Sequence, residues 1–401
     1  MNNYRLGLIA WIGLTLLVVT PLMAEKFVFK YQVGQKYRVI SEVKQLYSYA
    51  GDSYRTDQLN RAVVNVVKVE GDRAWHEMDY QNSRETQNAD QVYQYDRLYK
   101  AAFWRDIQGV YTIDPLFFVP PVRDIPVFFD KDLQIGDTWT NTANEVQDLR
   151  SLGIIEPFAY TFPVSYEYKG KAEWKGKPYD LIVINYNIFY PIRKVWPQAI
   201  LSPKIMGGYS HQKMYWDNET GRAVHYDEEY FLMLTFADGH IATWEGTATA
   251  NIEDIIPFDT ANATKDVRKK LDDMKLSNVT VREDKQGVTI SIENIQFAPD
   301  SADLLASEKA KLDSISKVLA QFADRPLLIT GHTALAGTEE GRQVLSEQRA
   351  QAVGQYLLDH KVRPRDSLQF QGKGATEALG DNQTDAGRAR NRRVEITILK
   401  E

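Results

Sequence analysis

Polar and apolar residues follow different periods in the two parts of this chain. From residue 25 to residue 254, short stretches such as "RAVVNVVKV", "DLIVINYNIFY" and "EEYFLMLTF" are rich in β-branched and aromatic side chains. Turn sequences such as "DNETG" and "ADG" separate them, so residues 213–252 are expected to form an antiparallel meander. No long stretch of helical period occurs in this part. We therefore predict a mostly antiparallel β domain over residues 25–254, either a sandwich or a concave half-barrel.

One segment of this β domain departs from the pattern. Residues 113–139 contain repeated prolines and two pairs of phenylalanines, in "LFF" and "VFF". Proline cannot donate a hydrogen bond to a neighbouring strand, so this segment is expected at a sheet edge or in a crossing connection. Its phenylalanines are expected to fill the core more readily than to line a ligand groove.

The pattern changes after residue 254. Residues 255–266, "IIPFDTANATKD", are polar and lack periodicity, which predicts a linker. Beyond them, "VTISI" and "PLLIT" are typical of buried strands, and "LQFQGKG" and "RRVEITIL" alternate as strands do. Apolar residues recur at helical spacing around Leu312 and Val353. We predict a self-contained α+β domain over residues 267–401, with a mixed sheet and helices on one face.

The first 24 residues have the order of a secretory signal peptide. Arg5 precedes an apolar run from Leu6 to Val19, and Pro21 and Ala24 follow. Cleavage before Glu25 is the favoured interpretation, and an uncleaved membrane anchor is the alternative, since the stretch from Leu6 to Ala24 is just long enough to span a bilayer. We therefore expect export to the periplasm, with outer-membrane or cell-wall association as further possibilities.

Composition limits the chemistry that the chain can perform. A net charge of −6 gives no basic field for nucleic acid, and the absence of cysteine excludes disulfides, thiolate metal sites and cysteine nucleophiles. The histidines do not fall at metal-binding spacings, and the sequence contains no nucleophile-elbow, phosphate-loop or dinucleotide motif. We predict no metal, no cofactor and no enzymatic activity. An envelope hydrolase with a convergent acid pair in the β domain remains the enzymatic alternative.

Motifs in the last third of the chain stand in a recognisable order. They are "IQFAPDSADL" (295–304), "ITGHT" (329–333), "LSEQRAQAVGQYL" (345–357), "FQGKG" (370–374) and "NQTDAGRARNRRVEI" (382–396). Together they resemble the OmpA-like C-terminal domain, with which Gram-negative envelope proteins grip peptidoglycan. The resemblance implies an α+β fold and a role in wall binding. Residues 25–254 carry no comparable resemblance.

The resemblance also implies a binding site for the free end of the diaminopimelate stem, which carries an ammonium and a carboxylate. Arg349, Arg392 and Thr333 stand at the implied stem-binding positions. However, Ala334 occupies the position where the family has an acid, and Arg342 stands where relatives usually have asparagine. Loss of one hydrogen bond to a charged group costs roughly 1.5–3 kcal/mol, which is enough to make useful binding marginal.

The altered position leaves several interpretations open. In one, Glu339 or Glu340 supplies a substitute acid from the same loop; in another, the ligand lacks the ammonium at that position. Alternatively, the domain retains only the fold and serves as a protein-interaction scaffold, with Arg349 satisfied by carbonyl groups or by an acid such as Asp300. The expected partners are therefore peptidoglycan, whether this binding is kept, altered or lost, and an unknown envelope protein or lipid for the β domain.

Overall fold

The computed structural model describes residues 24–87, 90–297 and 304–401. Residues 1–23, which hold almost all of the predicted signal peptide, lie outside the described part. Among the described helices, none is both long and apolar enough to span a membrane.

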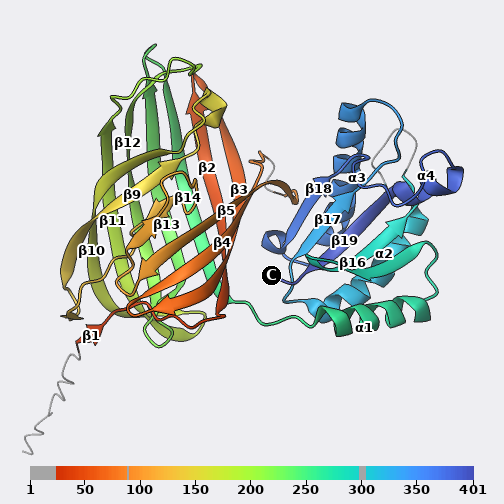
Figure 1. Cartoon of the computed structure of the whole chain (residues 1–401), viewed down its shortest axis with the longest axis horizontal. Coiled ribbons are helices and arrows are strands. Elements are labelled where there is room, and N and C mark those ends of the chain that lie inside the picture. Colours follow the sequence, from red (N-terminus) through yellow and green to blue (C-terminus); the bar gives the residue numbers. More distant parts are fainter. Residues whose placement is uncertain (1–23, 88–89, 298–303) are drawn as a thin grey trace, which may run out of the picture.

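The N-terminal part folds as one large, strongly curved antiparallel sheet (Figure 1). In spatial order its strands are β7 (Val122–Arg123), β9 (Thr138–Gln147), β10 (Phe158–Trp174), β11 (Lys177–Pro191), β12 (Pro203–Asp217), β13 (Arg222–Phe236), β14 (Ile241–Asp254), β2 (Lys36–Tyr49), β3 (Asp52–Glu70), β4 (Arg73–Ser83), β5 (Tyr93–Asp106) and β6 (Tyr111–Ile113). The sheet curves until its two ends meet, where the Tyr111 amide donates to Asp124 Oδ1 over 2.8 Å. A single curved sheet is therefore found, as in the half-barrel alternative. The meander over β12, β13 and β14 is confirmed.

Alternating side chains build the core of this sheet. Along β10 the buried residues are Phe158, Tyr160, Phe162, Val164 and Tyr166, while the residues between them are exposed. The period of two arises because successive side chains of a strand point to opposite faces. Large aromatic side chains thus line the concave face, and they form the main apolar cluster.

The proline-rich segment crosses between the two ends of the sheet and contributes β7 and β8 (Asp132–Leu133). β8 pairs with β1 (Glu25–Lys26) as a separate two-stranded sheet. Phe128 is buried and packs between Phe27 and Trp216, whereas Phe129 is exposed. One phenylalanine of this pair therefore fills the core, and the other faces solvent.

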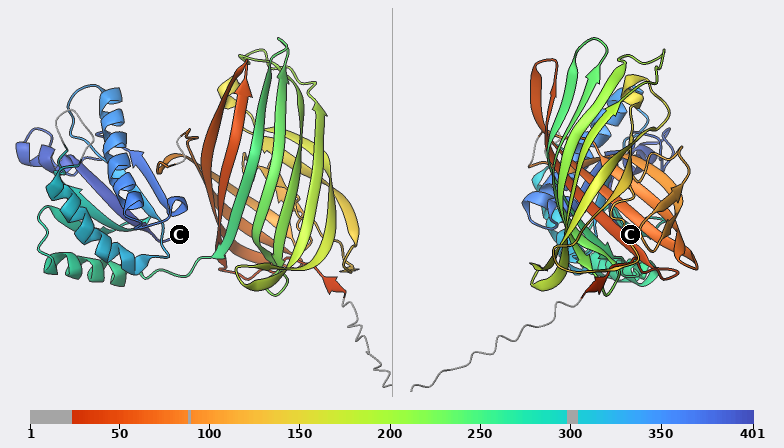
Figure 2. Two further views of the ribbon diagram at one scale, coloured as in Figure 1. Left: turned by 180° about the vertical axis from the view of Figure 1, so that it is seen from behind. Right: turned by 90° about the vertical axis from the view of Figure 1, so that its left-hand side faces the viewer.

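The C-terminal part is the expected α+β fold. Its strands are β15 (Val279–Glu283), β16 (Gly287–Glu293), β19 (Arg393–Leu399), β17 (Leu327–Gly331) and β18 (Leu368–Gly372), in spatial order. All pairs are antiparallel except β17 with β18. Its helices are α1 (Thr260–Asp273), α2 (Ala306–Leu319), α3 (Glu339–Asp359) and α4 (Asp385–Asn391). Apolar residues of α1, α2 and α3 pack with those of the sheet in one cluster, so these helices cover one face (Figure 2).

The segment expected as a linker is partly helical. β14 ends at Asp254, but α1 begins at Thr260, and the Asp259 side chain caps it by accepting from the Asn262 amide. Ala263 and Val267 are buried against the C-terminal sheet. The helix went unrecognised because small and polar residues hide an apolar stripe that continues to Leu271. The polar connection is therefore limited to residues 255–259.

The two parts are also joined through strand pairing, which the sequence analysis did not foresee. β5 extends the C-terminal sheet by pairing in parallel with β18, at Tyr93 with Gln369 and Gln94 with Phe370. Val92 is buried in the C-terminal apolar cluster. The C-terminal domain, expected to be self-contained, thus takes one core residue and one edge strand from the β domain.

Candidate functional site

The residues of the predicted site lie around the loop that follows β17. At Gly331 a Cβ atom would lie 2.0 Å from the Ser346 carbonyl oxygen, so only glycine allows α3 to pack this closely. The loop ends at Thr338, whose hydroxyl accepts from the Gly341 amide and starts α3. This close packing places the α3 side chains directly beside the loop.

Arg349 lies on α3, at the fifth position of the motif "LSEQRAQAVGQYL". Its guanidinium carbon is 5.2 Å from the centre of the Phe297 ring. Its Nε is buried without a hydrogen-bond partner, and no ion pair joins Arg349 to another described residue. Burial, followed by the nearby charge of Arg392, lowers the pKa of Arg349. The guanidinium is thus held by aromatic packing while its polar edge stays unused.

Arg392 approaches the same place from the junction of α4 and β19. Its Nη2 donates weakly to Asn294 Oδ1 over 3.4 Å. The preceding residue, Asn391, is fully buried and accepts from the amides of Leu379 and Gly380. Asn391 therefore fixes the backbone from which Arg392 projects.

The loop itself presents Thr333 and Ala334, both buried. The Thr333 hydroxyl has no hydrogen-bond partner, although its amide donates to the Gly374 carbonyl over 2.8 Å. Asn382 ties the neighbouring loops together, because its Oδ1 accepts from the Leu335 amide. Ala334 leaves this loop without the acid that the resemblance would place there.

The suggested substitute acids lie at a distance along the same helix. Glu339 and Glu340 are exposed in the first turn of α3. They precede Arg349 by ten and nine residues, which corresponds to roughly 14 Å along a helix axis. Arg342 turns back to donate to the Gly337 carbonyl over 2.5 Å. Asp300, the other acid considered for Arg349, lies outside the described residues.

The charged side chains around Arg349 are all positive among the described residues. Arg349 and Arg392 are close enough for the charge of one to lower the pKa of the other, and no described acid forms an ion pair with either of them. A planar guanidinium with free donors binds a carboxylate through paired hydrogen bonds. The arrangement of Arg349, Arg392 and the free Thr333 hydroxyl therefore suits an anionic group.

A network of buried charged side chains supports the loop that follows β17. Glu395 accepts from both terminal nitrogens of Arg282, at 2.9 and 2.7 Å, and from Arg393 Nε at 2.6 Å. Burial alone would raise the pKa of Glu395, but the nearby His332 ring and the hydrogen bonds from Arg282 and Arg393 outweigh it and hold the pKa well below its usual range. The His332 amide donates to the Arg393 carbonyl over 2.9 Å. The network thus fixes the residue that precedes Thr333.

The arginines near the C-terminus do not form one basic patch. Arg388 pairs with Asp385, Arg390 lies 3.9 Å from Glu293, and Arg393 is buried against Glu395. Among these four described arginines, Arg392 is the one whose charge lowers the pKa of Arg349. Sequence reasoning found both arginines through their motifs. It missed the contribution of Phe297, although this residue lies inside the motif "IQFAPDSADL".

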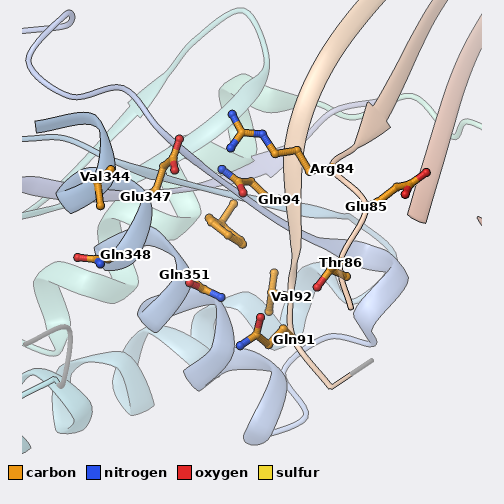
Figure 3. A pocket seen from close by; sticks show the side chains of 11 residues that line it. Arg84, Glu85, Thr86, Gln91, Val92, Gln94, Val344, Glu347, Gln348 and Gln351 are labelled. Atoms are coloured by element: carbon orange, nitrogen blue, oxygen red, sulfur yellow. The ribbon is translucent and has the colours of Figure 1, made fainter. Parts of the chain in front are cut away.

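A hollow of about 200 Å³ lies between the two domains. Figure 3 shows the side chains that line it, which come from residues 84–94 and from the side of α3. Polar side chains dominate its lining, among them Arg84, Gln91, Gln94, Glu347, Gln348 and Gln351. Its volume is below the roughly 300–1,000 Å³ of typical small-molecule sites. We assign it no ligand.

The β domain holds two acids on its concave face. Glu145 is buried, and burial together with the nearby charge of Glu228 raises its pKa to about 7. Glu228 accepts from Ser210 over 2.6 Å and from Gln212 over 3.0 Å. The sequence pattern gave no reason to pair Glu228 with Glu145, because the two lie on strands far apart in the chain. In the described residues, no group of three or more potential ligands could hold a metal ion.

Comparison with known proteins gives a family match at the C-terminal end. Residues 296–392 match the OmpA family. Outer membrane protein A of Bordetella avium is 34% identical over 103 residues, which are 26% of this chain and 53% of that protein. The peptidoglycan-binding protein ArfA of Mycobacterium tuberculosis H37Rv is 35% identical over 104 residues, which are 26% of this chain and 32% of that protein. The chain therefore spans about half or less of these relatives.

Solved structures match the same region. An outer membrane protein from Borrelia burgdorferi B31 is 40% identical and covers 30% of this chain and 96% of that chain, with a TM-score of 0.26. The cell wall anchor of the type VI secretion system from Pseudomonas aeruginosa is 30% identical and covers 34% of this chain and 96% of that chain, with a TM-score of 0.30.

Proposed function

We propose a function for this chain from the premise that its residues 296–392 form an OmpA family domain. The expected family is thereby confirmed, and it is limited to the last quarter of the chain. We infer that the chain is a non-enzymatic cell-envelope protein that associates with peptidoglycan. The name of the mycobacterial relative, a peptidoglycan-binding protein, supports this inference.

The observation that carries the proposal is the unused guanidinium of Arg349. Leaving a buried donor without a partner costs roughly 1–3 kcal/mol, and more for a charged group. A ligand carboxylate would remove this cost by accepting from Arg349, with Arg392 and Thr333 completing its hydrogen bonds. We propose that the carboxylate at the free end of a peptide stem occupies this place.

Ala334 changes how the site can bind the ammonium of the stem. The acid expected there would pair with the ammonium of the stem, and alanine offers no counter-charge. Glu339 and Glu340 lie in the first turn of α3, more than two turns from Arg349. We therefore propose that this domain holds the stem mainly by its carboxylate, and that these two acids are weaker candidates for the missing contact.

The domain division, location and second partner form part of the same proposal. The predicted signal peptide and the name of the Bordetella relative support a periplasmic protein associated with the outer membrane or cell wall. The β domain would then bind another envelope component, either protein or lipid. The hydrolase alternative is less favoured, because Glu145 is buried among aromatic side chains, whereas glycan cleavage needs acids in an open groove.

Sedimentation with purified sacculi tests the proposal. The mature protein is expected to pellet, and Arg349→Ala is expected to bind about 10- to 150-fold more weakly, as loss of a charged hydrogen bond implies. Arg390→Ala is the matched control, since it removes the same charge from an exposed position. It is expected to pellet like the wild type.

Ala334→Asp separates the remaining interpretations. If the wild type stays in solution and only Ala334→Asp pellets, the native domain has lost stem binding and the scaffold alternative is favoured. If neither protein pellets, the proposed association with peptidoglycan is wrong for this wall.

A further inference from the structure

One end of the β domain exposes a group of large apolar side chains. We call this group the apolar end. Its four side chains are each between 65% and 77% exposed, and they are Ile155, Phe189, Val195 and Ile200. They come from the end of β11 and from the loops that connect β9 with β10 and β11 with β12. These connections lie at the upper end of the β domain in Figure 1, away from β1. Isolated exposed apolar residues are ordinary, but a group at one end of a domain indicates an interaction site.

The two loops are fixed to each other. Lys194 Nζ and Trp196 Nε1 both donate to Glu156 Oε1, at 2.7 and 2.5 Å. The Ile200 amide donates to the Leu152 carbonyl over 2.9 Å. Gly153 has a φ of 82°, and a Cβ there would lie 2.9 Å from the Gln198 carbonyl oxygen. Hydrogen bonds and close packing therefore hold the backbone of both loops in place, and the exposed side chains of the apolar end project from that backbone.

Positive charge surrounds the apolar end. Arg193 and Lys204 are exposed, and neither forms an ion pair or a side-chain hydrogen bond within the described residues. Arg193 and Lys194 line a surface hollow of about 380 Å³ together with Tyr190 and Pro191. The two acids of the β9–β10 connection are already paired, Glu156 with Lys194 and Asp148 with Arg150, so Arg193 and Lys204 are not neutralised by them. Unpaired cations favour an anionic partner. The exposed apolar side chains beside them favour a partner that also has an apolar interior.

We propose that the apolar end inserts into the surface of a bilayer that contains anionic phospholipid. The aliphatic and aromatic tips would enter the boundary between headgroups and acyl chains, and Arg193 and Lys204 would face lipid phosphate. Partly buried Tyr190 and buried Trp196 lie just below the tips, where amphipathic rings suit a membrane interface. This inference does not rest on peptidoglycan binding.

The position of the apolar end leaves it free to meet a membrane. The linker leaves the opposite end of the sheet, where the Ile255 amide donates to the Lys36 carbonyl. β11 has 15 residues, so about 45 Å separates the two ends at the rise of a strand. The C-terminal domain contacts β3, β4 and β5 along the side of the sheet. No described contact of that domain covers the apolar end.

Vesicle flotation with the full-length mature protein tests this inference. The wild type is expected to float with vesicles of phosphatidylcholine and phosphatidylglycerol and to bind pure phosphatidylcholine more weakly. The double variant Ile155→Ser/Ile200→Ser is expected to bind about tenfold more weakly or worse, because it removes two inserting side chains. Arg193→Glu is expected to lose at least about fivefold on anionic vesicles.

The matched control changes exposed aliphatic side chains at the opposite end. Val33→Ser/Ile256→Ser replaces residues that are 67% and 66% exposed, and it is expected to bind like the wild type. Equal binding by Ile155→Ser/Ile200→Ser and the wild type would overturn the inference, since attraction would then be purely electrostatic. Failure of the wild type to float would also overturn it. So would a wild-type dimer in analytical ultracentrifugation that becomes a monomer in the same double variant, since the apolar end would then be a dimer interface.

Discussion

At the scale of single residues, the pocket at Arg349 is defined by one retained charge and one lost charge. Arg349 packs on Phe297 and keeps an unpaired nitrogen, while Ala334 removes the acid that would balance a zwitterion. Both positions were identified from sequence, because the motifs place them by number. Whether an acid from elsewhere replaces the missing one depends on three-dimensional distance, which the motifs do not give.

Glu145 and Glu228 show the opposite case. They lie far apart in sequence, on β9 and β13, and come under mutual electrostatic influence only through the curvature of the sheet. The residues around them give no local signal, since each strand alternates in the ordinary way. This buried pair was therefore beyond the reach of pattern analysis.

The raised pKa of Glu145 predicts a pH dependence of stability. Its pKa rises from 4.5 when unfolded to about 7 when folded, so the folded state binds the proton more tightly between these values. The free energy of unfolding should therefore fall as pH rises from about 4.5 through 7 and then level off. Glu145→Gln should remove the part of this fall that Glu145 causes, which makes the variant more stable than wild type at pH 8 by up to about 3 kcal/mol.

Urea unfolding at pH 5 and pH 8 measures this difference. The gain in stability of Glu145→Gln should be large at pH 8 and small at pH 5. A gain of equal size at both values would show that the effect comes from packing and not from ionisation.

At the scale of elements, the link between the domains depends on residues 90–94. The Val92 amide donates to Gln355 Oε1 over 3.2 Å, and Gln355 donates back to the Asp90 carbonyl. Arg365 pairs with Asp57 at 2.7 Å. The stretch "QVYQYDRLYK" lies within the predicted β domain, and nothing in its pattern indicates a second partner in the C-terminal sheet.

Substitution of Val92 should uncouple the two domains. Val92→Asp would place a carboxylate in the C-terminal apolar core, at a cost of about 3 kcal/mol or more. We expect the segment to leave the core, and the radius of gyration in small-angle X-ray scattering to increase. Leu98→Asp on the same strand, at an exposed position, is the control and should leave the scattering unchanged. An unchanged radius for Val92→Asp would show that other contacts hold the domains together.

At the scale of the whole molecule, periodicity was enough to predict the two fold classes and their order along the chain. Strand alternation and turn residues predicted the antiparallel sheet, and mixed periods predicted the α+β fold. The closure of the sheet, the start of α1 at Thr260 and the shared edge at β18 all depend on contacts between distant segments. Those features required the structure.

The central claim, that the domain holds a peptide stem by its carboxylate, is tested most directly by calorimetric titration with soluble stem peptides. Three ligands are compared: the stem ending in diaminopimelate, an analogue with its free carboxylate amidated, and an analogue with hydrogen in place of the ammonium. Amidation should weaken binding by at least about tenfold, because Arg349 and Arg392 lose their anion, whereas removal of the ammonium should change it little. A loss confined to the analogue without the ammonium would contradict the claim and show that an acid still serves the site.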